Sequence, residues 1–142
     1  AGGQRRAAVL DASDKTIRLH GQWQGAASTE PTITLSELID PVDFAIAADH
    51  SLVVVDRGGH SVHRFAIDGT PLTTWGERGG DHGQFWRPAA VVVDHHNRVI
   101  VLDHGNHRAQ MFQPDGTWLM TFGTGRAWTK RATPPAADTE TN

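Results

Sequence analysis

Short apolar runs alternate with short polar turns along most of this chain of 142 residues. One run covers residues 52–55 (Leu-Val-Val-Val), and another covers residues 99–102 (Val-Ile-Val-Leu). Neither run shows the spacing of three and four residues that an amphipathic helix requires. Continuous apolar runs of this length are typical of strands that are covered on both faces. We therefore expect an all-β fold.

The pattern repeats with a period of 47 residues. Residues 41–76 align with residues 88–123 without a gap, and 12 of the 36 aligned positions are identical. Ordinary composition would give roughly two identities by chance. A repeat of this length, between 40 and 50 residues, is typical of the blades of a β-propeller.

Each copy of the repeat predicts four short antiparallel strands, the number found in one propeller blade. Asp-Gly pairs at residues 68–69 and 115–116 predict type I′ hairpin turns before the last strand of each copy. The predicted strands are residues 44–47, 52–55, 61–66 and 72–75 in the first copy, and 91–94, 99–102, 108–113 and 119–122 in the second.

The second copy resembles an NHL repeat, a propeller repeat named after an Asn-His-Leu motif. Asn106-His107-Arg108 stands at the equivalent place, and the first copy carries Gly59-His60-Ser61 there. The resemblance implies a partial, open β-propeller built from NHL-type four-stranded antiparallel blades. The matching residues are Gly83, Phe85, Pro88, Asp94, Asn97, Asp103, Asn106, His107, Arg108, Phe112, Asp115, Gly116 and Gly123.

The repeat divides the chain into five parts. In the first of them, Val9-Leu10-Asp11 matches the second strand of a blade, and Gln22–Gly25 matches the last. The final part contains Pro134-Pro135 and a polar end, which is typical of a disordered tail. The parts are a degenerate partial blade (1–25), a linker (26–37), two NHL-like blades (38–76 and 77–123) and an extended or disordered tail (124–142).

The number of blades is too small for a closed ring. Propellers close with at least four blades, whereas two complete copies and a remnant are encoded here. An open arc exposes apolar strands and unpaired edges. We therefore expect a protein partner or a homo-oligomer to complete the arc, unless the chain is a fragment of a longer propeller.

Composition narrows the function further. The net charge of −3 lacks the basic excess of a nucleic-acid-binding protein. The chain has no cysteine, which excludes thiolate metal sites and cysteine nucleophiles, and no apolar run reaches the 18 residues of a membrane span. The start, Ala1-Gly2-Gly3, fits cleavage of a signal peptide and suggests a periplasmic or extracellular location.

No catalytic, metal-binding or cofactor-binding residue stands out. Asp56 and Asp103 precede glycine-containing loops, where a carboxylate usually fixes the turn by accepting backbone N–H groups. The nine histidines include His95-His96, which would point to opposite faces if they lay on a strand. A triad of Asp56, His60 and Ser61 lacks a recognisable nucleophile setting.

Related propeller enzymes suggest an alternative. The resemblance to the peptide-amidating lyase implies metal-binding histidines just after the proline that opens each blade. Here Pro41 is followed by Val42-Asp43, and Pro88 by Ala89-Ala90, so those ligands are missing. Streptogramin lyases use a histidine on the central face with an acidic partner, and no such pair can be transferred.

Interaction residues are instead expected in loops that share one face of the arc, because arginine and tryptophan often anchor interfaces. Phe85 and Trp86 could also simply pack between blades. The primary interpretation is a non-enzymatic interaction or scaffolding subunit of a larger assembly, without a cofactor. The alternative is a part of a propeller lyase or hydrolase with its site on the ring axis. The candidate interaction residues are Arg57, His60, Arg78, His82, Trp86, Arg87, His104 and His107.

Overall fold

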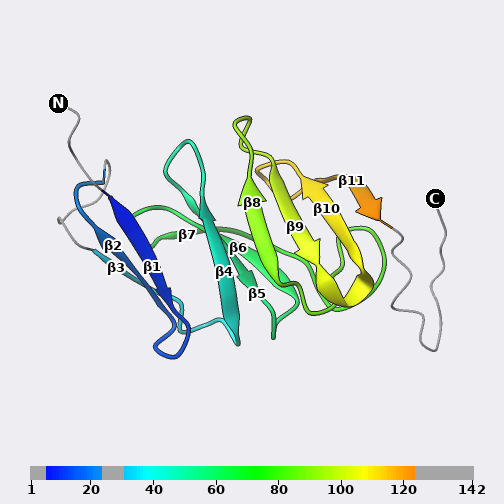
Figure 1. Ribbon diagram of the computed structural model, residues 1–142, viewed down its shortest axis with the longest axis horizontal. Coiled ribbons are helices and arrows are strands. Elements are labelled where there is room, and N and C mark those ends of the chain that lie inside the picture. The colour runs from blue at the N-terminus through cyan, green and yellow to red at the C-terminus, as the bar shows by residue number, and fades with distance from the viewer. Residues whose placement is uncertain (1–5, 24–30, 124–142) are drawn as a thin grey trace.

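The computed structural model describes residues 6–23 and 31–123, which form three antiparallel sheets and no α-helix. These sheets stand side by side in chain order (Figure 1). The N-terminal sheet has strands β1 (Ala7–Asp11), β2 (Thr16–His20) and β3 (Thr32–Thr34). The central sheet has β4 (Pro41–Ile46), β5 (Leu52–Asp56), β6 (Ser61–Phe65) and β7 (Pro71–Trp75). The C-terminal sheet has β8 (Ala90–Val93), β9 (Val99–Asp103), β10 (Arg108–Phe112) and β11 (Trp118–Gly123), with a short 3₁₀ turn at His104–Asn106.

Each four-stranded sheet is a simple meander in which neighbours along the chain pair. The innermost strands β4 and β8 lie side by side (Figure 1). This order confirms the predicted blades, with strand ends that differ from the expected ones by a few residues. The all-β fold and the open arc were thus correctly predicted from the repeat.

Two apolar cores fill the spaces between the sheets. One core lies between the N-terminal and central sheets and includes Ile17, Leu19 and Leu52. The other lies between the central and C-terminal sheets and includes Val53, Phe85 and other residues of both sheets. All five residues of β5 are buried, which confirms that this strand is covered on both faces.

The last strand of the N-terminal sheet is β3, not the predicted strand Gln22–Gly25. Trp23 turns into the first core, and its indole Nε1 donates a hydrogen bond to the His20 carbonyl oxygen at 3.1 Å. Thr32–Thr34 supplies the alternating pattern instead, with Ile33 buried between two exposed threonines. The expected linker (26–37) therefore contains a strand.

The hairpin turns also differ in type from the prediction. Only the glycine of each Asp-Gly pair has a positive φ, +93° at Gly69 and +95° at Gly116. The Gly69 N–H donates to the Ala66 carbonyl, and the register between β6 and β7 shifts beside the turn. This geometry is typical of a type I turn followed by a left-handed glycine. The extra loop residue removes the need for positive φ at the aspartate.

No helix in residues 6–23 and 31–123 has the length and hydropathy to cross a membrane. The expected tail (124–142) lies outside the described residues.

Candidate functional site

A buried carboxylate organises the entrance to the C-terminal sheet. Asp103, at the end of β9, is fully buried. Its Oδ1 accepts the Trp86 backbone N–H at 2.7 Å, and its Oδ2 accepts Asn106 Nδ2 at 2.9 Å and Arg108 Nε at 2.8 Å. Burial raises the pKa of Asp103, and these donors oppose that effect. The structural role expected for this aspartate is confirmed.

Arg108 connects this carboxylate to the loop that precedes the sheet. Its guanidinium donates to the carbonyl oxygens of Gly80, Asp81 and Gln84, each at 2.9 Å. Gln110 adds a hydrogen bond to the Gln84 carbonyl at 2.8 Å. Asp103, Asn106, Arg108 and Gln110 therefore form a clamp, named here the loop clamp, which fixes residues 79–84.

The central sheet keeps the carboxylate but not the rest of this clamp. Asp56 accepts the backbone N–H groups of Ile39 and Asp40 at 2.9 and 2.7 Å. The positions of Arg108 and Gln110 are occupied by Ser61 and His63, whose side chains share a 2.9 Å hydrogen bond. The turn-fixing aspartate is thus common to both repeats, whereas the arginine that grips the incoming loop occurs in the second only.

The loops at one end of the arc meet around Trp86. The His60 ring stacks on the Trp86 indole at 5.1 Å between centroids, and the Arg78 guanidinium lies 4.5 Å from a Trp86 ring centroid. The His60 Nδ1 accepts the Arg87 backbone N–H at 3.0 Å. The structure therefore brings together four of the candidate residues, His60, Arg78, Trp86 and Arg87.

The other four candidates do not join this cluster through any printed contact. His82 stacks on Trp118 at 3.9 Å, and Arg57 forms a 2.9 Å ion pair with Asp40. His104 lies in the 3₁₀ turn, and its carbonyl accepts the His107 N–H at 3.1 Å. His107 and its counterpart His60 both have φ of +54°, so this position of the repeat has a fixed left-handed backbone.

Both rings of Trp86 and Phe85 serve packing between sheets. Phe85 is fully buried in the second core, as expected from the sequence. Trp86 has its two faces occupied by His60 and Arg78. The Trp86 carbonyl also accepts the Gly105 N–H at 2.7 Å. This cluster therefore holds two loops together and leaves neither indole face open for stacking with a ligand.

The serine–histidine pair of the central sheet is mostly enclosed. Ser61 is 7% exposed and bonds to His63 Nε2, while Thr74 Oγ1 lies 3.2 Å from His63 Nδ1. Burial lowers the pKa of His63, and Asp56 partly offsets this. His60, the base considered in the sequence, turns instead to Trp86. The expected triad of Asp56, His60 and Ser61 does not form.

His95 and His96 lie in a turn, not on a strand, and their ring centroids are 4.1 Å apart. The expectation that they point to opposite faces is therefore wrong. Even so, no group of three histidine, aspartate or glutamate side chains suited to a metal ion occurs in the described parts of the chain.

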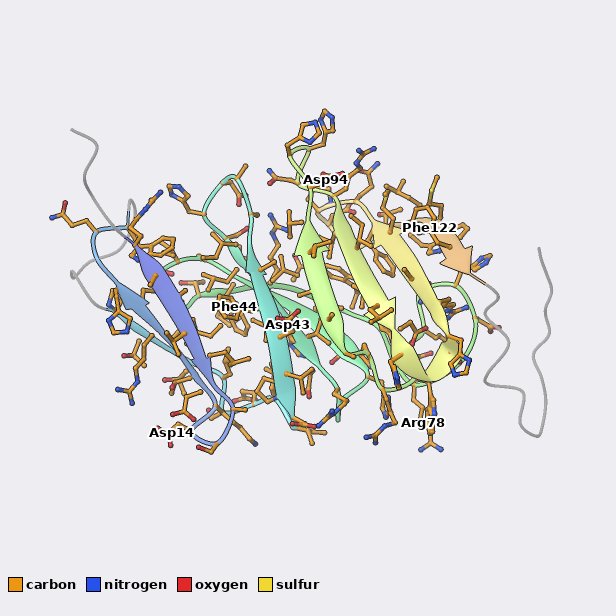
Figure 2. The ribbon with its side chains drawn as sticks, viewed as in Figure 1. Asp14, Asp43, Phe44, Arg78, Asp94 and Phe122 are labelled. Carbon is orange, nitrogen blue, oxygen red and sulfur yellow. The ribbon has the colours of Figure 1, made fainter. Side chains whose placement is uncertain are left out.

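The most distinctive surface is the outward face of the C-terminal sheet, named here the apolar face. Phe122 lies at this end of the arc (Figure 2). Strand register places the side chains in two rows of four that cross the sheet. Val92 is 57% exposed, and Leu102, Met120 and Phe122 are each more than 40% exposed. The rows are Ala90, Leu102, Ala109, Phe122 and Val92, Ile100, Met111, Met120.

The opposite end of the arc is polar. One row across the outward face of the N-terminal sheet consists of Val9, Arg18 and Thr32, and Thr34 lies in the next row. Arg18 and both threonines are exposed. The two open ends are therefore unlike in character, which the sequence pattern alone did not reveal.

Comparisons with known proteins show the fold. No protein-family model and no curated protein matches the chain, so the NHL assignment remains a prediction. Its structure is similar to a catalytically inactive virginiamycin B lyase from Staphylococcus aureus, solved with quinupristin (TM-score 0.62, 13% identity, 83% of this chain and 37% of that one). It is also similar to a streptogramin B lyase (0.61, 10%, 82% and 39%) and to a protein of unknown function from Bacteroides caccae (0.51, 13%, 87% and 47%).

These likenesses decide the architecture. The described residues form an open arc of a β-propeller. The chain spans less than half the length of each of these three structures.

Proposed function

We propose that this chain is a non-enzymatic interaction module that docks a partner protein on the apolar face of its C-terminal sheet. One observation carries the proposal: two complete rows of apolar side chains lie uncovered across four strands. Contiguous apolar surface of this kind marks interaction sites in soluble proteins.

The repeat itself indicates what fits this face. Ile100 and Leu102 occupy the positions of Val53 and Val55 in the preceding copy. Val53 and Val55 are fully buried because the C-terminal sheet packs on them. The same positions one repeat later therefore suit the inner face of another sheet, with alternating apolar residues.

The polar end of the arc argues against a head-to-tail ring of identical copies. Such a ring would place the apolar face against the face that carries Arg18, Thr32 and Thr34. Burying an unpaired arginine against methionine and phenylalanine is unfavourable. We therefore favour a different protein as partner over closure by copies of this chain.

The test uses the double variant Met120→Glu/Phe122→Glu. Both side chains are largely exposed, so the free energy of unfolding should change by no more than about 0.5 kcal/mol per site. Size-exclusion chromatography of the chain from its native source should show an assembly larger than 15.4 kDa, which the double variant reduces to the monomer.

The control is Thr32→Glu, an exposed position on the opposite end of the arc, which should leave the assembly intact. A wild-type chain that remains a monomer in native extract would contradict the proposal. Equal loss of assembly in the control would show that net charge, not the apolar face, determines docking.

The alternative of a lyase or hydrolase gains only the fold from the two lyase structures. The innermost strands β4 and β8 carry no histidine. We therefore do not extend the lyase activity to this chain.

A further inference from the structure

The N-terminal sheet has three strands, whereas the other two have four. We propose that the free edge of β1 binds an extended segment of a partner protein, which adds the fourth, innermost strand. This site lies on the N-terminal sheet and does not depend on docking at the apolar face.

Strand β1 corresponds to the second strand of a blade, not to the first. Asp11 ends β1 as Asp56 ends β5, and Leu10 points into the core next to the following sheet as Val55 does. In the central sheet, β5 has β4 along its inner edge. In the N-terminal sheet, β1 pairs with β2 alone, and the equivalent of β4 is missing from the described residues.

Backbone direction shows which groups of β1 are free. The Leu19 N–H donates to Pro31 on the β3 side, and Leu19 is opposite Ala8 in β1. Backbone groups alternate in direction along an antiparallel strand. Ala8 and Leu10 therefore direct their N–H and C=O groups away from β2, toward the free edge.

The central sheet shows how such an edge is completed. The Ala47 N–H donates to Ser51, so alternation makes Ala45–Val53 and Asp43–Val55 the hydrogen-bonded pairs between β4 and β5. Val53 and Val55 correspond to Ala8 and Leu10 in the aligned blades. An added strand antiparallel to β1 would form the same pairs.

The neighbouring sheet also shows a space for this strand. The contact between β1 and β4 is less extensive than the contact between β4 and β8. Phe44 lies on the β1 side of β4, and Asp43 on the β8 side (Figure 2). Phe44 and Ile46 are only partly buried, although both pack on the first core. A strand beside β1 would cover them.

The chemistry of the partner segment follows from the strand that it imitates. It is an extended stretch of about five residues, the typical length of a strand. Residues opposite Ala8 and Leu10 face β4 and contact Phe44, so a small or apolar side chain is required opposite Ala8. Main-chain hydrogen bonds supply the affinity, as in other cases of strand addition to a sheet edge.

The experiment titrates the full chain with a synthetic peptide of residues 39–48 of this protein, which contains the whole of β4. Amide hydrogen exchange is followed by NMR. At a peptide concentration of 100 times Kd, exchange at Ala8 and Leu10 should slow about 100-fold by mass action. The amides of Val9 and Asp11, which point toward β2, should change little.

Two N-methylated peptides provide the matched comparison. Methylation at the positions of Asp43 and Ala45 removes the donors to β1 and should abolish the slowing. Methylation at Phe44 and Ile46 leaves those donors intact and should preserve it. The variant Met120→Glu/Phe122→Glu should respond like the wild type, which separates this site from the apolar face.

Three results would overturn the proposal. The peptide could leave exchange at Ala8 and Leu10 unchanged, or both methylated peptides could act equally. Slowing could appear instead at β7 or β11. Finally, Ala8 and Leu10 could already exchange slowly in the full chain and rapidly after truncation at Gly123, which would assign the edge to the chain's own residues 124–142.

Discussion

Replacement of Arg108 by methionine separates the electrostatic part of the loop clamp from its volume. Methionine keeps an unbranched side chain but removes the four hydrogen bonds to Asp103, Gly80, Asp81 and Gln84. The side chains of Arg108 and Asp103 are 4% and 0% exposed, so the variant leaves a buried carboxylate without its cation. Loss of one partner from a buried ion pair costs about 3–5 kcal/mol.

The matched control is Arg57→Met. Arg57 also forms a 2.9 Å ion pair through Nε, with Asp40, but the two side chains are 41% and 40% exposed. Solvent screens such a pair, and its loss should cost about 0–1 kcal/mol. The two variants therefore remove the same kind of contact at very different burial.

The measurement is urea unfolding, followed by tryptophan fluorescence at neutral pH. A domain of this size has a total stability of about 5–15 kcal/mol, so Arg108→Met could leave little folded protein. The double variant Asp103→Asn/Arg108→Met removes the stranded charge and should recover part of the loss. Equal costs for Arg108→Met and Arg57→Met would refute the claim that burial gives the clamp its strength.

Three further predictions concern packing and titration. Phe85→Ala should lower the free energy of unfolding by about 3–5 kcal/mol in the urea assay, because the ring is fully buried in the second core. Gly105→Ala should destabilise the chain and alter tryptophan fluorescence, because a Cβ there would meet both the ring and the carbonyl of Trp86; a thermal midpoint equal to that of the wild type would contradict this. Burial lowers the pKa of His63 below 6.5, so the native state binds its proton more weakly than the unfolded chain does. Stability should therefore fall as the pH drops from about 7.5 to about 5.5, and His63→Gln should flatten this dependence; an unchanged slope would show that His63 is not responsible.

The strands were predictable because the information that specifies them is local. Each copy of the repeat has an apolar run for a covered strand and an Asp-Gly pair for the hairpin. Strand β3 was missed because Thr32–Thr34 is too short to show a pattern. Trp23 misled the alignment, since an aromatic residue near the expected last strand imitates Trp75 of the central sheet.

The loop clamp was only half predictable. The turn-fixing role of Asp103 follows from its place before a glycine-containing loop. The partners of Arg108 are backbone carbonyls 24–28 residues earlier in the chain, and no spacing rule connects them. Likewise, the sequence predicted uncovered strands, but register was needed to show that Met120 and Phe122 join one continuous apolar face.

The complete burial of β5 has a consequence for how this protein unfolds. Leu52 and Val54 belong to the first core, while Val53 and Val55 belong to the second. A partly unfolded state that loses either core would leave one side of this strand exposed to water. Although the chain is built from repeats, its two cores are thus coupled through alternate residues of a single strand. The arc should melt as one cooperative unit, with β5 among the last segments to exchange its amide hydrogens.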